Sequence, residues 1–108
     1  MIRAIPLPQN ESNFEVITDL DGTDFRLRFL WNDRLSRWSL TLYDSSGTQI
    51  HGAMIVVVDM PIYYRDTSED APKGDLYCVD ITGEGRDPGL RDLGRRCQLI
   101  YVDEESLV

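Results

Sequence analysis

The segment FRLRFLWNDRLSRWSLTLYD, residues 25–44, carries the strongest pattern in this chain and decides its fold class. Large apolar residues occupy alternate positions on both sides of a polar hexad, residues 32–37. A period of two in bulky residues is typical of half-buried strands, and the polar hexad between them predicts a hairpin. A slip of one residue would oppose apolar to polar side chains, so the register is well specified. The expected pairs are Phe29 with Leu40, Leu27 with Leu42 and Trp31 with Trp38.

A strand before this hairpin extends it into a sheet. Residues 14–18 are expected to form a strand, and the Asp21-Gly22 dipeptide that follows is a strong signal for a type I′ turn. Pairing through this turn sets Val16 opposite Leu27 and Phe14 opposite Phe29. The same register sets Glu15 opposite Arg28, which is a favourable cross-strand charge pair.

A strand after the hairpin completes a four-stranded antiparallel meander. The tetrapeptide Asp44-Ser45-Ser46-Gly47 suits a three-residue loop with glycine in the left-handed conformation. This turn predicts that Leu42 pairs with Ile50 and Trp38 with Met54. The meander then has one apolar face, and its members are Phe14, Val16, Phe25, Leu27, Phe29, Trp31, Trp38, Leu40, Leu42, Ile50 and Met54.

The second half of the chain must cover that apolar face, because a sheet with one apolar side is stable only against a second layer. Residues 54–58 form a continuous apolar run, which predicts either a strand buried on both faces or a segment that crosses between sheets. Further strands are expected at residues 76–81 and 97–102. No long segment keeps an apolar period of 3.6 residues. The sequence therefore predicts an all-β fold, an antiparallel sandwich or partly open barrel of about six to eight strands.

The chain length of 108 residues predicts one domain, residues 1–108. Its first 13 residues are a possible extended arm, because the prolines in Ile5-Pro6-Leu7-Pro8 disfavour helix and cannot donate to a ladder. Three interpretations stay open for this segment: an edge strand, an arm that grips a neighbouring subunit, and a strap that closes the end of its own core.

The charge of the chain excludes some classes of partner. A formal net charge of -8 and a pI near 4.4 oppose binding to nucleic acid, which depends on Lys and Arg neutralising phosphates, and to anionic membranes. There is no run of about 18 apolar residues and no basic segment leading into an apolar one at the N-terminus. We expect no nucleic-acid partner, no membrane partner and no secretion signal.

No group of residues predicts catalysis. His51 is the only histidine, and nothing in its spacing favours a nucleophile and base arrangement with a serine or cysteine. Cys78 and Cys97 fall in predicted strands and are expected to be buried thiols that behave as small hydrophobes. A zinc site would need four ligands at spacings that are not found here. The expectation is a protein that is not an enzyme and that needs no cofactor or metal.

The glycine-rich segment of residues 80–92 has two interpretations. Its glycines and Pro88 allow tight turns, and the neighbouring arginines Arg86, Arg91, Arg95 and Arg96 would then pair with nearby carboxylates. Alternatively, carboxylates could surround a Ca²⁺ ion, which takes six to eight oxygen ligands. That second interpretation makes the chain a small acidic Ca²⁺- or ligand-binding β module, with Asp80, Glu84, Asp87 and Asp92 as the ligands.

Several motifs together resemble a known family. The motifs are IPLP near the start, LDG before FRLRFLWNDR, RWSLTLYD with its glycine turn, and GDLYCVDITGEGRDPGLRDLGRRCQLIYV. Over nearly the whole chain the sequence resembles the baseplate plug family of contractile-tailed bacteriophages. The resemblance implies a non-enzymatic structural subunit of the virion tail baseplate, assembled in the bacterial host cytoplasm. It also implies contacts with the hub, the spike and the tail tube, and several copies around the tail axis.

The residues expected to contact those partners lie in three segments. Apolar or arginine-bearing loops with a charged rim are typical of protein interfaces. The arm, the segment after the apolar run and the glycine-rich segment meet this description. The expected contact residues are Ile5, Pro6, Leu7, Met60, Ile62, Tyr63, Tyr64, Arg86, Leu90, Arg91 and Leu93.

Overall fold

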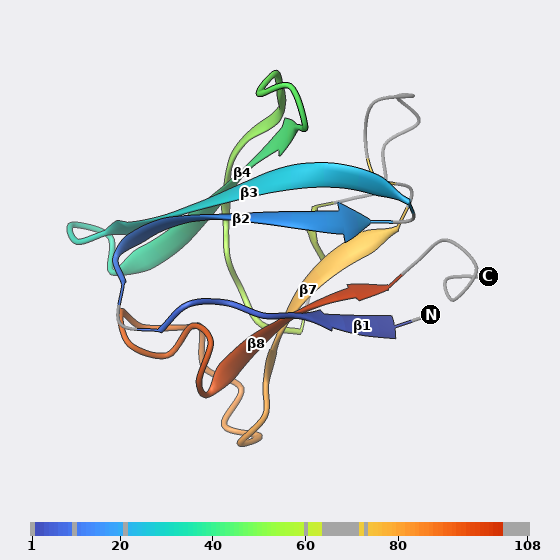
Figure 1. Cartoon of the computed structure of the whole chain (residues 1–108). Helices are drawn as coiled ribbons and strands as arrows, with labels where there is room; N and C mark the ends of the chain where they lie inside the picture. Colours follow the sequence, from blue (N-terminus) through green and yellow to red (C-terminus); the bar gives the residue numbers. More distant parts are fainter. Residues whose placement is uncertain are drawn as a thin grey trace.

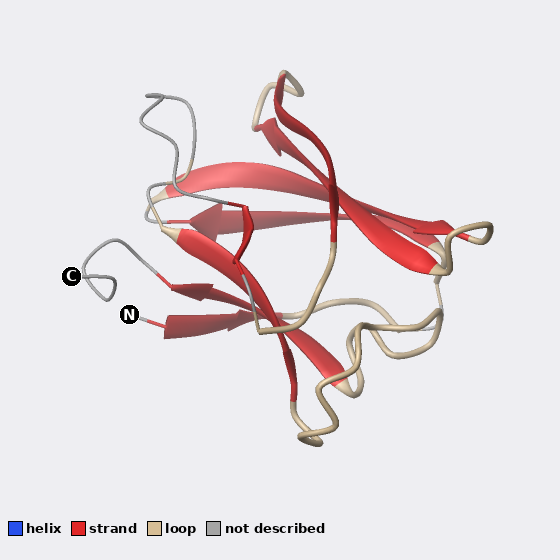
Figure 2. Cartoon of the chain, turned by 180° about the vertical axis from the view of Figure 1, so that it is seen from behind, coloured by secondary structure: helices blue, strands red, loops and turns tan. Residues whose placement is uncertain are grey.

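The computed structural model describes residues 2–9, 11–20, 22–59, 61–63, 72 and 74–102. Within these residues there are eight strands and no helix, so the predicted all-β fold is confirmed (Figures 1 and 2). Two antiparallel sheets, ordered β2-β3-β4-β5 and β1-β8-β7-β6, form a sandwich-like arrangement. The strands are β1 (Ile2–Ile5), β2 (Asn13–Leu20), β3 (Thr23–Asn32), β4 (Arg37–Asp44), β5 (Gln49–Ile55), β6 (Pro61–Tyr63), β7 (Asp75–Asp80) and β8 (Cys97–Val102).

The first three strands of the meander pair in the predicted registers. Trp31 lies opposite Trp38 and Phe29 opposite Leu40 across β3 and β4. Across β2 and β3, Phe14 lies opposite Phe29 and Glu15 opposite Arg28. The ion pair of Glu15, however, runs diagonally to Arg26, at 3.9 Å between Oε1 and Nη1. Both of those side chains are well exposed, so the pair contributes little to stability.

The predicted register of β5 is wrong over most of its length. Gly47 has the expected positive φ of 93°, and next to the turn Tyr43 pairs with Gln49 as that register requires. Two irregularities then shift the pairing, so that Leu42 faces His51 and Leu40 faces Met54. The cause is the sequence QIHGAMI, which has a glycine in its interior and no strict alternation. Such a strand specifies its register weakly and accommodates bulges.

The apolar run of residues 54–58 starts in β5, and the part after Ile55 crosses from one sheet to the other. Val56 is buried, and its backbone N–H donates to the Trp38 carbonyl at 2.9 Å. Two residues later, Val58 forms an isolated parallel bridge with Cys78 of the second sheet. Of the two interpretations of this run, the crossing is the one that the structure adopts. The crossing segment, residues 56–59, therefore links the edges of the two layers.

The second sheet is built on the pair β7 and β8, close to the positions predicted for them. The N-terminal segment β1 forms an edge strand antiparallel to β8, which is one of the three interpretations left open. Its Arg3 donates to the Thr18 hydroxyl at 3.1 Å and to the Asp19 carbonyl, so β1 is also tied to β2 of the other sheet. The opposite edge is the short strand β6, whose pairing with β7 is irregular.

The core lies between the two sheets and includes residues from both. All members of the predicted apolar face are either buried or packed against this core, and Leu20 is a buried residue of the meander that the prediction omitted. Trp38 is 1% exposed and lies in edge contact with Phe14 and Trp31, at 5.6 Å and 5.7 Å between ring centroids. In the described part of the chain, no helix has the length and apolar character needed to cross a bilayer.

Candidate functional site

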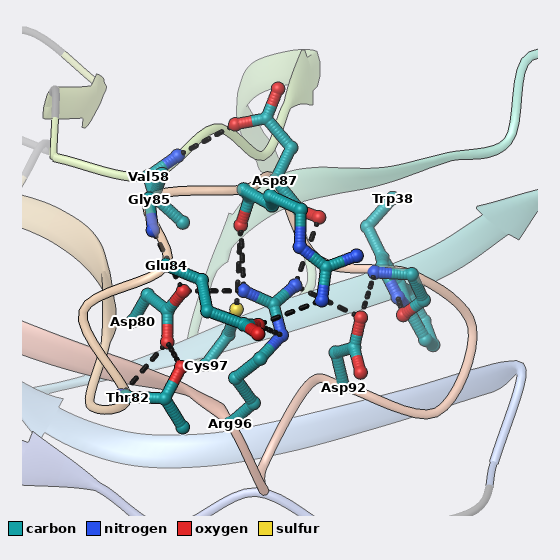
Figure 3. A network of polar contacts seen from close by, with 12 residues as sticks. Trp38, Val58, Asp80, Thr82, Glu84, Gly85, Asp87, Asp92, Arg96 and Cys97 are labelled. Carbon is teal, nitrogen blue, oxygen red and sulfur yellow. Dashed lines mark hydrogen bonds and ion pairs between the residues drawn. The ribbon is translucent and has the colours of Figure 1, made fainter.

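The loop between β7 and β8, residues 81–96, is organised around the side chain of Arg96 (Figure 3). Its guanidinium donates to Asp80 Oδ2 at 2.6 Å and to Asp92 Oδ2 at 2.9 Å. It also donates to the carbonyls of Arg86 at 2.9 Å and Asp87 at 3.1 Å. The Arg96 side chain is 10% exposed and that of Asp80 only 2%. A single buried cation thus fixes both ends of the loop.

Asp80 closes the start of the loop. Its carboxylate accepts hydrogen bonds from the Thr82 hydroxyl at 2.6 Å, from the Thr82 N–H and from the Gly85 N–H. Burial alone would raise the pKa of Asp80, but the Thr82 and Arg96 hydrogen bonds outweigh it and hold the pKa well below its usual value. Asp80 is therefore a charged structural group.

Asp92 closes the end of the loop in the same way. Its Oδ2 accepts from the Gly89 N–H at 2.7 Å and from Arg96. The hydrogen bond from Arg96 lowers the pKa of Asp92, against a smaller opposing effect of burial. A carboxylate held in this way stays ionised at neutral pH and keeps the turn before it closed.

The position expected for Ca²⁺ is thus occupied by a guanidinium. Asp80 and Asp92 bind Arg96, Glu84 Oε2 lies 3.8 Å from Arg96 Nε, and the Asp87 carboxylate bonds to Arg37 and to the Val58 N–H. The described residues contain no cluster of His, Cys, Asp or Glu arranged to hold a metal. The geometry favours the interpretation in which arginines pair with the loop carboxylates, as Arg86 and Arg96 do. The expectation is wrong for Arg91, which forms no ion pair among the described residues.

The loop is attached to the first sheet by polar contacts. Trp38 Nε1 donates to the Gly89 carbonyl at 2.9 Å, and Arg37 forms an ion pair with Asp87. The same Asp87 carboxylate accepts from the N–H of Val58 at 3.1 Å. The end of the central hairpin and the crossing segment therefore both hold this loop in place.

A second set of contacts joins the loop to the connection between β1 and β2. Gln9 Nε2 donates to the Gly94 carbonyl at 3.1 Å, and Arg95 Nε donates to Gln9 Oε1 at 3.2 Å. Gly94 has φ +85°, and a Cβ at this position would lie 3.2 Å from the carbonyl oxygens of Leu7 and Pro8. Only glycine fits this conformation and this approach without strain.

A cleft of about 410 Å³ lies between these two segments, and we term it the arginine cleft. Figure 1 shows the connection between β1 and β2 and the loop between β7 and β8 at the same end of the sandwich. The cleft is lined by Glu11, Ser12, Leu90, Arg91 and Arg95. Two of these residues, Leu90 and Arg91, are among the expected contact residues.

Comparison with protein families identifies the chain's relatives. The family described as cyanophage baseplate Pam3 plug gp18 matches residues 2–104. The chain belongs to this baseplate plug family. The resemblance found in the sequence motifs is confirmed, and the family name is consistent with a structural subunit of a phage baseplate. No curated protein matches the chain by sequence.

In this plug family member, the expected contact residues fall into three groups. Pro6, Arg86, Leu90 and Arg91 are exposed, and Leu7 is partly buried against the core. Met60 and Tyr64, and the side chain of Tyr63, lie outside the described residues. The remaining side chains face the chain's own core and are not available at its surface; these are Ile5, Ile62 and Leu93, which are 1%, 7% and 3% exposed.

The sequence interpretation also missed residues of the cleft. Arg95 was expected only as an ion-pairing residue, and Glu11 and Ser12 were not singled out. Nothing local marks Glu11 and Ser12, because only the folding of the β1–β2 connection against a loop some 80 residues away brings them to the cleft.

The two thiols of the chain are buried, as expected for small hydrophobes. Cys78 and Cys97 are both 0% exposed, and they lie in the adjacent strands β7 and β8 as free cysteines. Burial raises the pKa of both thiols. Because the thiolate is the reactive species, we expect alkylation of the folded protein at pH 8 to be about 100-fold or more slower than in 6 M guanidinium chloride. Mass spectrometry of iodoacetamide-treated samples measures the two rates, and equal rates would contradict the burial of these thiols.

Proposed function

We propose that this chain is a non-enzymatic structural subunit of the baseplate of a contractile phage tail. It joins the central hub and spike complex to the tail tube, in several copies around the tail axis, and assembles in the host cytoplasm. The observation that carries the proposal is membership of a baseplate plug family over residues 2–104.

The chemistry of the loop between β7 and β8 supports this role. Its most buried ionisable groups, Asp80 and Arg96, are bonded to each other and to the backbone. Groups held in this way fix the shape of a surface and leave no activated nucleophile or base. A surface shaped in advance loses little conformational entropy when a partner binds, which suits an assembly subunit.

Co-purification with the partners tests the proposal. The chain is mixed with the hub, spike and tail tube proteins of the phage that encodes it, and each mixture is run on a size-exclusion column. We expect the chain to elute with at least one hub or spike protein and with the tube protein. Stable, specific protein interfaces bury about 1,000 Å² or more of surface. Elution as an isolated chain in every mixture would count against the proposal.

A further inference from the structure

We propose that the arginine cleft binds an acidic segment of another baseplate protein, with a partner carboxylate on Arg91 and a partner apolar side chain against Leu90. This inference rests on the proposed function, because it names the chemistry of one of the partners. Membership of the family gives neither the location of this binding site nor the charge of the segment that it binds.

Arg91 differs from the other arginines of its loop. Arg86 pairs with Glu84 at 2.7 Å, and Arg96 pairs with Asp80 and Asp92. Arg91 is exposed and makes no ion pair or hydrogen bond within the part of the chain that the structure describes. A guanidinium offers planar, paired donors that match a carboxylate. The guanidinium of Arg91 is therefore available to bind a carboxylate of a partner.

Leu90 places an apolar contact beside that guanidinium. Leu90 is 41% exposed and lines the cleft, whereas the nearby Leu93 is 3% exposed and belongs to the core. Arginine is enriched in interface hot spots, and an exposed apolar residue beside it adds apolar surface that a partner can bury. The occupant is therefore both acidic and partly apolar.

The walls of the cleft are fixed before a partner arrives. On the loop side, Gly89 is held by Trp38 and Asp92, and Arg96 anchors the chain that follows. On the other side, the Ser12 carbonyl accepts from the Trp31 N–H at 2.9 Å. These contacts reduce the entropy that binding would otherwise remove.

Charge favours a different protein over a second copy of this chain. The lining of the cleft carries two arginines and one glutamate, whereas the whole chain carries a formal charge of -8. When two copies approach to within the screening length of about 8 Å at physiological salt, their like net charges repel. A protein that is neutral or basic overall and carries one acidic segment avoids this repulsion and still complements the cleft.

The test is a double variant with a matched control. Leu90→Ser/Arg91→Glu removes the apolar contact and reverses the charge in the cleft. Ile17→Thr/Arg28→Glu makes equivalent changes on the outer face of β2 and β3, where both residues are exposed and Ile17 is 63% exposed. The dissociation constant of each variant is measured for whichever hub, spike or tube protein the wild-type chain binds, at low and high salt. Thermal melts verify that both variants fold.

We expect the cleft variant to bind at least about tenfold more weakly and the control to stay within about threefold of wild type. Binding of the wild type should weaken as salt rises, and the cleft variant should lose most of that dependence. Equal affinities of the two variants, or self-association of the wild type that the cleft variant abolishes, would overturn the inference. If the wild type binds none of the proteins, the proposed function fails instead.

Discussion

Replacing Trp38 with alanine is expected to lower the free energy of unfolding by about 3–5 kcal/mol, the range measured for large aromatic residues removed from protein cores. Trp38 is 1% exposed, and its ring lies in edge contact with Phe14 and Trp31. Its indole N–H also holds the Gly89 carbonyl of the loop between β7 and β8. The substitution would therefore remove core packing. It would also remove a hydrogen bond that holds the β7–β8 loop, which forms one side of the arginine cleft. Urea denaturation followed by circular dichroism measures the change.

Two further variants separate the packing from the hydrogen bond. Trp38→Phe keeps an aromatic ring but leaves the Gly89 carbonyl without its donor, which we expect to cost about 1–3 kcal/mol. Trp31→Ala should cost less than Trp38→Ala, because Trp31 is only partly buried and its indole N–H bonds to the exposed Asp33. A Trp38→Ala protein as stable as the wild type would show that the hairpin does not hold the core and loop together.

Arg96→Met is expected to lower the melting temperature by roughly 10 °C, because it leaves the buried Asp80 and the half-buried Asp92 without their cation. Arg91→Met is the matched control, since it removes the same charged group from the same loop at a position that has no ion pair among the described residues. The control should change the melting temperature by no more than about 2 °C. Differential scanning calorimetry compares the two, and equal melting temperatures would contradict the structural role of Arg96.

The same pair of variants has a predicted pH dependence. The pKa values of Asp80 and Asp92 are lowered in the folded chain, so these groups stabilise it above the usual carboxyl pKa of about 3.9. As pH falls below about 5, the unfolded state takes up protons that the folded state does not, and this stabilisation is progressively lost. Melting temperatures between pH 3 and pH 7 should therefore fall more steeply for the wild type and Arg91→Met than for Arg96→Met. Parallel curves for all three proteins would show that Arg96 does not set those pKa values.

Sequence reasoning succeeded where two constraints agreed. The registers of β2, β3 and β4 follow from alternating bulky residues together with definite turn signals, and the structure has the predicted pairs. It failed for β5, where the turn was read correctly but the sequence QIHGAMI does not alternate, and two bulges shift the pairing. The residues of a turn fix the strand pairing only next to the turn. Along the rest of the strand, the register depends on regular alternation of apolar and polar residues.

The candidate site was harder to predict than the fold. The arginine and carboxylate composition of residues 80–96 indicated internal ion pairs, but not that Arg96 alone would anchor both ends of the loop. Apolar character also did not separate surface from core, so Ile5, Ile62 and Leu93 were expected at an interface and are buried. Pairing with a distant strand decides which side of a short segment faces the core, and sequence alone shows this poorly.

The central claim is that this chain is a structural component of a phage tail baseplate. Quantitative mass spectrometry of purified virions, and of baseplates separated from tails and capsids, tests that claim most directly. We predict that peptides of this chain occur in the baseplate fraction at a constant ratio to the hub proteins, and that they are depleted from the capsid fraction. A chain that is made in infected cells but is absent from purified virions would contradict the account.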